Sequence, residues 1–114
     1  MKFVQKGSAT EYKNAASCIA HEYEMGTPDI NIARVEVNGR YPEGGTAVNT
    51  EVTELVYVAA GSGIVSCNSI PTLLSEGDAV SIAPGEHIYW EGTLTLIVAC
   101  SPAWHPDQYV LKDD

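Results

Sequence analysis

Short runs of strand-forming residues, separated by turn signals, extend through most of the sequence. The runs are rich in Val, Ile, Thr and Tyr, which favour the pleated, half-buried surface of a β-sheet. The segments between them contain Gly, Pro, Asn and Asp, which supply the backbone angles of tight turns. Strands that recur about every 8 to 12 residues are typical of an all-β sandwich or barrel. The pattern predicts strands at 30–37, 53–60, 63–67, 79–83, 87–90 and 93–100.

The glycines mark the expected chain reversals. The turn signals include "VNGR" (37–40), "AGSG" (60–63) and "WEGT" (90–93). Asn38 and Gly39 both tolerate positive φ, so this dipeptide predicts a two-residue hairpin turn. A second hairpin is expected at "GSGIV" (61–65).

Helix is scarce in this pattern. The segment "SATE" (8–11) has the form of a capping box, but the residues after it allow no more than a turn or two. Near the end of the chain, Pro102 directly follows Ser101, a possible N-cap, and predicts one helical turn. Pro106 limits the length of that turn.

Length, charge and cysteine content narrow the class of protein. A chain of 114 residues predicts one domain, over 1–114. Its net charge of −9 argues against nucleic acid or an anionic membrane as a partner, because both require a basic surface. Cys18, Cys67 and Cys100 lie far apart and form no CxxC pair, which is typical of free thiols in a reducing compartment. With neither an apolar signal region nor a membrane-length apolar run, the sequence predicts a cytoplasmic protein.

Two segments carry a family resemblance. Glu54 is followed after six residues by Gly61, and Gly77 is followed after five residues by "APG" (83–85). In this order, with residues 62–76 between the two glycines, the segments resemble the two motifs of small single-domain members of the cupin superfamily. The resemblance covers roughly residues 30–100 and implies a β-barrel of the jelly-roll type, usually paired into a homodimer. The segments 1–29 and 101–114 would then pack on the barrel or on a dimer partner.

The resemblance also implies a metal site, whose ligands are two histidines and the glutamate of the first motif and the histidine of the second. Here the first pair of positions holds Val48 and Thr50, or Ala47 and Asn49 with the longer motif spacing. The second motif ends at Ile88, so only Glu54 retains the family's ligand type. A transition metal requires several converging N, O or S donors. We therefore expect a degenerate metal motif, with no metal and no other cofactor.

His87 lies one residue before the second-motif position. A shift of one residue along a strand moves a side chain to the opposite face of the sheet. If Ile88 and Trp90 face the barrel interior, His87 and Tyr89 face away from it. Two alternatives remain open: His87 performs acid–base chemistry in a pocket, or a local bulge turns it into a metal ligand.

Glu54 is the most informative single residue. By strand alternation it shares the interior face with Val56 and Val58. An interior carboxylate without a metal either pairs with a cation, for which Arg34 is the candidate, or is held as a neutral acid with a raised pKa. A neutral acid of this kind is typical of a general acid or base.

The remaining candidates are polar and aromatic residues near the barrel mouth. We predict that Tyr41, Asn49, Glu54 and Trp90 contact a ligand, and we take Glu54, His87 and Tyr89 as candidate catalytic residues. The hypothesis is a metal-free protein that binds a small polar molecule in its barrel. The alternatives are a metal-independent isomerase or epimerase that uses Glu54 or His87 with a tyrosine, a metal enzyme with a displaced site, and an interaction module that acts through its dimer surface.

Overall fold

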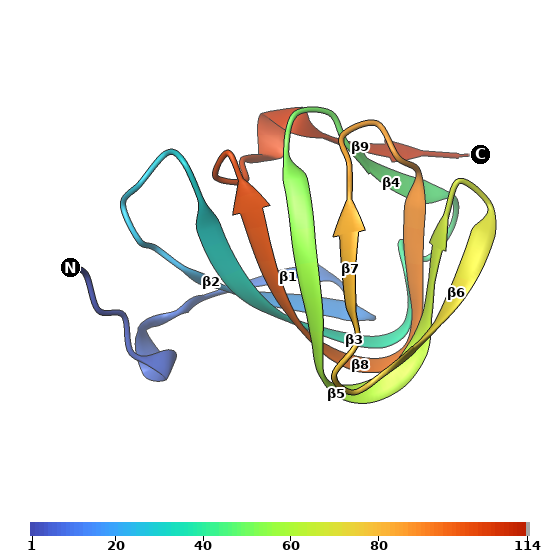
Figure 1. The fold of residues 1–114 in the computed structure, drawn as a ribbon, viewed down its shortest axis with the longest axis horizontal. Coiled ribbons are helices and arrows are strands. Elements are labelled where there is room, and N and C mark those ends of the chain that lie inside the picture. The colour runs from blue at the N-terminus through green and yellow to red at the C-terminus, as the bar shows by residue number, and fades with distance from the viewer. Residues whose placement is uncertain (114) are drawn as a thin grey trace.

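The computed structural model describes residues 1–113, and almost all of their regular structure is β-strand. Figure 1 shows the strands curling into a barrel that is open at one end. The prediction of an all-β barrel with little helix is confirmed. In chain order the elements are η1 (Lys6–Ser8), β1 (Thr10–Ala15), β2 (Cys18–Tyr23), β3 (Asn31–Tyr41), β4 (Thr46–Asn49), β5 (Thr53–Cys67), β6 (Ile70–Ser75), β7 (Ala79–Ile82), β8 (Ile88–Ser101), η2 (Pro106–Gln108) and β9 (Tyr109–Lys112).

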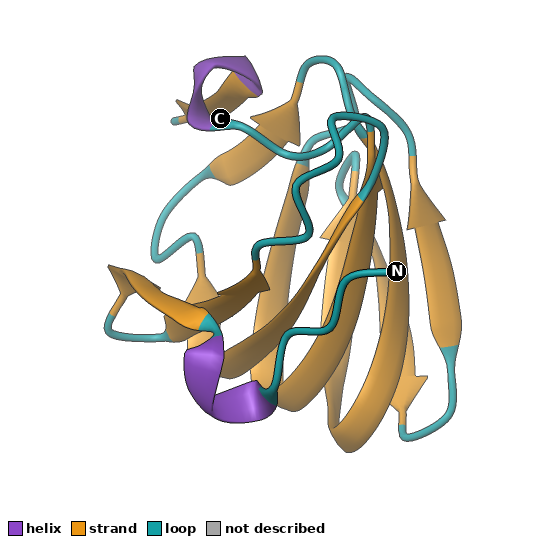
Figure 2. Ribbon diagram, turned by 90° about the vertical axis from the view of Figure 1, so that its left-hand side faces the viewer, coloured by secondary structure: helices purple, strands orange, loops and turns teal. Residues whose placement is uncertain are grey.

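Strand β8 organises the sheet. It pairs antiparallel with β3 along one side and with β5 along the other, and its first residue also pairs with β4. One end of the sheet continues from β3 through β2 to β1, while β4 pairs with β9, and β6 and β7 both pair with β5. Figure 2 shows the resulting curvature, which leaves an interior between the strands.

Three predicted turns are wrong, because their glycines lie inside long strands. Asn38 and Gly39 are within β3, the "AGSG" segment is within β5, and the "WEGT" segment is within β8. Gly39 pairs with Gly92, and Gly92 pairs with Gly63, so three neighbouring strands carry glycine in one row. A Cβ atom at Gly63 would overlap the carbonyl oxygen of Glu91, and one at Gly92 would overlap that of Ser62. The row therefore permits a close approach of the strands where they bend.

The hairpin between β5 and β6 reverses at Asn68 and Ser69. Their φ angles are 49° and 70°, the positive values that a two-residue hairpin turn of the favoured hand requires. This turn contains no glycine, and it therefore gives a weaker sequence signal than Asn38-Gly39.

The two short helices differ in position from the predictions. The helix η1 ends at Ser8 instead of beginning there, and the following residues form β1. The helix η2 begins at Pro106, because proline fits the first turn of a helix, and Ser101 is the last residue of β8. Within residues 1–113, no helix is both long enough and apolar enough to cross a membrane.

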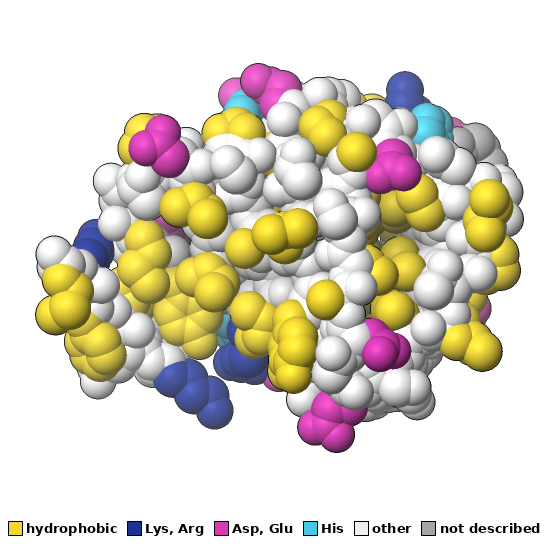
Figure 3. Space-filling view, in the orientation of Figure 1, with side chains coloured by type: hydrophobic (Ala, Val, Ile, Leu, Met, Phe, Trp, Pro, Cys, Tyr) yellow, Lys and Arg dark blue, Asp and Glu magenta, His cyan; other side chains and the backbone are white. Residues whose placement is uncertain are grey.

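The core lies on the inner faces of β3, β5 and β8. Val56 and Val58 on β5 pair with Val98 and Leu96 on β8, and all four side chains are buried. The alternate residues face outward, where Leu55 on β5 is 59% exposed. Figure 3 shows hydrophobic side chains gathered on the face that β3, β5 and β8 present to the viewer. The inner rows become polar at the open end of the barrel, where Glu54 pairs with Cys100 and Cys100 with Asn31.

Candidate functional site

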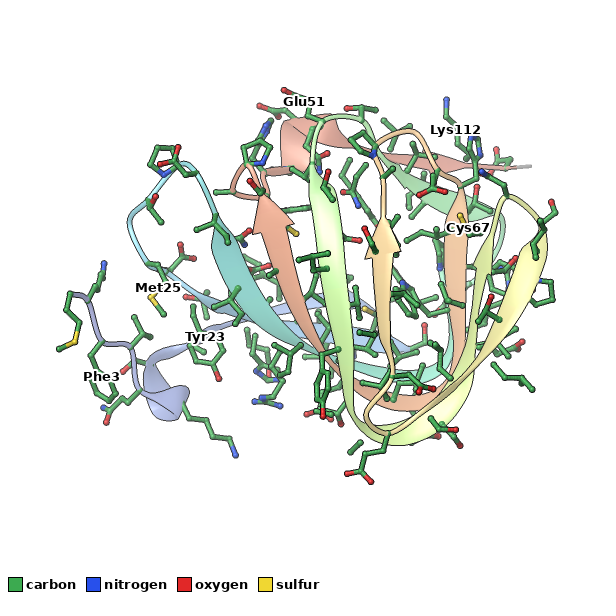
Figure 4. All side chains as sticks on the ribbon, viewed as in Figure 1. Phe3, Tyr23, Met25, Glu51, Cys67 and Lys112 are labelled. Carbon is green, nitrogen blue, oxygen red and sulfur yellow. The ribbon has the colours of Figure 1, made fainter. Side chains whose placement is uncertain are left out.

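A cavity of about 890 Å³ occupies the open end of the barrel. Its wall is built by β1 to β5 and β8, by the loop between β2 and β3, and by the segment after β8. The four predicted ligand-contacting residues all line it: Tyr41, Asn49, Glu54 and Trp90. Figure 4 shows Tyr23, another wall residue, beside the β2–β3 side of the barrel, and Glu51 at the rim.

Glu54 lies in the polar row of the wall. The Cys100 thiol donates to Glu54 Oε2 at 3.6 Å, and the Asn49 side chain also hydrogen-bonds the carboxyl group. Glu54 keeps some exposed surface because the cavity opens to solvent, but protein atoms surround its carboxyl group closely. Burial raises the pKa of Glu54, and this effect exceeds the opposite effect of the two hydrogen bonds, while the charge of Glu22 raises the pKa further.

The orientation of Asn49 follows from the donors around it. Gln108 Oε1 accepts hydrogen bonds from the backbone N–H groups of Glu51 and Val52, so Gln108 Nε2 is the atom that donates to Asn49 Oδ1, at 2.8 Å. The Trp104 indole can only donate, and its Nε1 lies 3.1 Å from the same oxygen. Both contacts fix the amide oxygen of Asn49 toward the C-terminal segment, which leaves its NH₂ group to donate to Glu54.

Of the two alternatives for Glu54, the one in which it pairs with Arg34 is wrong. Arg34 lies on the outer face of β3 and forms an ion pair with Glu36 on the same strand. Residues 34 and 36 have the parity opposite to that of the interior residues Ala33, Val35 and Val37, so the guanidinium cannot reach the cavity. The described part of the cavity wall contains no lysine and no arginine.

The arrangement of strands matches solved structures over nearly the whole chain. A structure of Pac13 from Streptomyces, a nucleoside dehydratase, aligns with a TM-score of 0.88 at 18% identity, covering 99% of this chain and 92% of that one. An RmlC-like cupin from Shewanella frigidimarina aligns with a TM-score of 0.75 at 14% identity, covering 94% of this chain and 95% of that one. The chain has the cupin fold. KdgF from Halomonas sp. is also similar, with a TM-score of 0.75 at 19% identity, over 94% of this chain and 97% of that one.

At the level of sequence, no family model and no curated protein matches the chain. The cupin fold is therefore shown by structure alone, with identities below 20%.

The two sets of candidate metal positions differ in whether their side chains line the cavity. Ala47, Asn49, Glu54 and Ile88 all line the cavity, whereas Val48 and Thr50 do not, so the structure selects the longer motif spacing. Two of the four side chains have no donor atom, and Asn49 Oδ1 already accepts two hydrogen bonds. This donor set does not fit a transition-metal ion.

His87 and Tyr89 do not line the cupin cavity. The backbone N–H of His87 donates to Asn68 Oδ1 at 2.9 Å, and its Nδ1 lies 3.3 Å from Thr46 Oγ1. The ring of Tyr89 lies under the Arg40 guanidinium, 3.9 Å from its centroid. Their neighbours Ile88 and Trp90 are buried and do face the cavity, as strand alternation predicts.

A tyrosine pair lies in the same cavity wall. The hydroxyl groups of Tyr41 and Tyr109 are 2.8 Å apart, and the Tyr109 ring packs edge-on against Trp104 with centroids 5.5 Å apart. Burial raises the pKa of both tyrosines, so both remain neutral hydrogen-bonding groups at neutral pH. Together with Glu54, they give the cavity two hydroxyl groups and one carboxyl group.

Five residues of the site were not predicted from the sequence: Glu22, Asn31, Trp104, Gln108 and Tyr109. All five lie outside or at the edge of the motif-bearing stretch. Trp104 lies between two prolines, and its large apolar surface favours packing of the tail on the domain. This was the one sequence signal for Trp104 and for Gln108 and Tyr109, which lie in the same tail. The others depend on the pairing of β2 with β3, which the sequence pattern did not predict.

We predict that Glu54→Gln changes the pH dependence of stability. Burial raises the folded pKa above the value of about 4.3 in an unfolded chain, so the folded state binds this proton more readily. The resulting stabilisation is complete below the unfolded pKa and is lost as the pH rises through the folded pKa. The free energy of unfolding of wild type, relative to Glu54→Gln, should therefore increase as the pH falls from about 7 toward 5.

Urea melts of both proteins at three pH values measure this difference. Glu76→Gln, at an exposed turn, is the matched control and should follow wild type at each pH. A constant difference between wild type and Glu54→Gln would show that the carboxyl group is fully hydrated.

Proposed function

We propose that this protein binds a small polar molecule in the cupin cavity, without a metal ion, and that Glu54 is the principal polar contact. The observation that carries the proposal is a carboxyl group in the wall of a cavity of about 890 Å³ that no lysine or arginine of residues 1–113 lines. The volume is within the range of small-molecule sites. Trp90 and Ile88 supply apolar wall, while Asn49, Tyr41 and Glu54 supply oriented hydrogen-bonding groups.

A metal-independent enzyme is the second candidate, and the tyrosine pair favours it. A carboxyl group with a raised pKa and two linked hydroxyl groups in one cavity are suitable for moving a proton on a bound substrate. Pac13, which is described as a nucleoside dehydratase, shares the fold and supports testing for activity. If the protein is such an enzyme, Glu54 is the acid or base and acts with Tyr41 or Tyr109, because His87 does not line the cavity. Isomerisation or epimerisation of a small polar substrate would require the same groups.

Ligand binding and its dependence on Glu54 test the proposed function. A panel of nucleosides, sugars and small amines is screened by thermal shift and titration calorimetry, with uridine included because a related Pac13 structure contains it. We expect at least one compound to bind, Glu54→Gln to weaken it about tenfold, and Glu76→Gln to leave it unchanged. Prior treatment with chelator should have no effect, and elemental analysis of untagged protein should find less than stoichiometric metal. One Zn, Fe, Mn or Ni ion per chain, or binding that is indifferent to Glu54→Gln, would contradict the proposal.

We further propose a C2 homodimer formed through strand β1. Within residues 1–113, β1 pairs only with β2, which leaves its other edge open, and an open edge favours pairing with another chain. In an antiparallel pair centred on Tyr12, Glu11 of one chain would lie opposite Lys13 of the other, twice by symmetry.

Light scattering at micromolar concentration should therefore give twice the 12.2 kDa chain mass. Lys13→Glu places like charges opposite each other and should shift the protein toward monomer. The double variant Glu11→Lys with Lys13→Glu restores opposite charges in the same register and should restore the dimer. A monomeric wild type, or a double variant that behaves like Lys13→Glu alone, would exclude this interface.

A further inference from the structure

The charges of the cavity wall are unbalanced. Glu22, Glu24 and Glu54 line it, whereas its only basic side chain among the described residues is His105, which lies 3.5 Å from Glu51 at the rim. The two arginines are engaged elsewhere, Arg34 with Glu36, and Arg40 with Tyr89 and with the carbonyl groups of Pro42 and Gly45. An anionic ligand would therefore meet carboxyl groups in a wall that contains no lysine or arginine of residues 1–113, and the ammonium group of Lys2 lies beside Gly26 on the β2–β3 loop.

Trp104 holds two of these carboxyl groups in position through two asparagines. Its indole Nε1 donates to Asn49 Oδ1, and its backbone N–H donates to Asn31 Oδ1 at 2.9 Å. Each asparagine then uses its NH₂ group on a glutamate: Asn31 Nδ2 donates to Glu22 Oε2 at 3.1 Å, and Asn49 hydrogen-bonds Glu54. Two carboxyl groups on different strands are thus oriented by one tryptophan, in a wall that is otherwise largely apolar.

We propose that the cavity selects a ligand that carries a protonated amine, which Glu22 and Glu54 recognise, and that it excludes phosphorylated and carboxylated compounds. This inference rests on the proposed function, because it names the chemical class of the molecule that the same cavity binds.

Three features of the wall favour an ammonium group over a neutral polar group. A cation supplies the positive charge that the wall lacks. In a partly desolvated cavity, the attraction between a cation and the carboxyl groups is stronger than in water. An ammonium group has three donors and no acceptor, which suits carboxyl oxygens whose asparagine partners are already fixed. Tyr41, Trp90, Trp104 and Tyr109 line the same cavity, and aromatic rings attract cations.

Matched compounds that differ in charge provide the test. One set is aminodeoxyuridine, uridine and uridine monophosphate, and the other is glucosamine, glucose and glucose phosphate. Each is titrated at neutral pH into wild type, Glu22→Gln and Glu76→Gln, with the amide and indole NMR signals of Asn31, Asn49 and Trp104 as the measure of binding in the cavity.

In at least one set we expect the amine to bind about tenfold more tightly than the neutral compound, with no binding of the phosphate. Glu22→Gln should remove most of that preference, and Glu76→Gln should behave as wild type.

The possible results separate this inference from the proposed function. Equal binding of amine and neutral compounds, or tighter binding of a phosphate, would overturn the amine selectivity and leave the proposed binding site intact. An amine preference that survives in Glu22→Gln would show that Glu22 does not recognise the ligand. No shift of the three side-chain signals with any of the six compounds would contradict both proposals.

Discussion

Replacing Gly61 with alanine is expected to destabilise the protein by about 3 kcal/mol or more. Gly61 lies inside β5 with a φ of 89°, and a Cβ atom there would overlap the backbone carbonyl oxygen of Thr93 on β8. The positive φ alone costs an alanine about 1–2 kcal/mol, and the overlap forces apart the most extensively paired strands of the barrel. The loss is a large fraction of the roughly 5–15 kcal/mol by which a domain is stable, so the urea midpoint of Gly61→Ala should fall well below that of wild type.

Two other glycines separate the causes of this effect. Gly77 has a φ of 92° but nothing within 4 Å of an added Cβ atom, so Gly77→Ala measures the backbone cost alone. Gly7 also has open space around it and no positive φ, so Gly7→Ala should be close to neutral. Urea melts should rank the losses Gly61→Ala, then Gly77→Ala, then Gly7→Ala. Equal losses for the first two would show that β5 and β8 can separate at Gly61 without cost.

Gln108→Leu is expected to cost about 3–5 kcal/mol, although the two side chains have similar volumes. Gln108 is 1% exposed, and its amide satisfies two backbone N–H groups and the oxygen of Asn49. Leucine satisfies none of these groups, and each buried polar group that loses its partner costs about 1–3 kcal/mol. The N–H of Val52 is the most severely affected, because Val52 is 0% exposed.

The chain provides a matched control in Gln5→Leu, which makes the same chemical change at an exposed position without a side-chain cap hydrogen bond. Denaturant melts should show a loss in Gln108→Leu and almost none in Gln5→Leu. In Gln108→Leu the Asn49 amide also loses one of the two donors that orient it, so the NMR signal of the Trp104 indole N–H should shift. Equal stability of the two variants would mean that water replaces the amide of Gln108.

The strands that form the barrel core were predictable because their residues alternate strictly. Val56 and Val58 are interior, Leu55 and Tyr57 are exterior, and Glu54 continues the interior series onto the cavity wall. The turns were less predictable, because a glycine that reverses the chain and a glycine that permits a bend inside a long strand look alike in sequence. Gly39, Gly63 and Gly92 permit a bend across three paired strands, and only the pairing reveals that they form one row.

The site was predictable where it depends on one strand and unpredictable where it depends on pairing. Asn49, Glu54 and Trp90 follow from motif position and alternation, and all three line the cavity. The orientation of Asn49 depends on Trp104 and Gln108, which are distant in sequence and reach it only when the C-terminal segment folds back beside β4. Glu22 likewise reaches Asn31 only through the β2–β3 pairing.

The positions of the tryptophans give the protein an internal optical reporter. The chain contains two tryptophans, Trp90 and Trp104, and both line the cavity. Indole fluorescence responds to local polarity and to the hydrogen bond of the N–H group, and Trp104 directs that bond to Asn49 inside the site. With no third indole to add background, selective excitation of tryptophan reports on the occupied cavity directly. Unlabelled protein is therefore suitable for rapid screening of ligands. Replacing either tryptophan with phenylalanine would assign the fluorescence change to the other one.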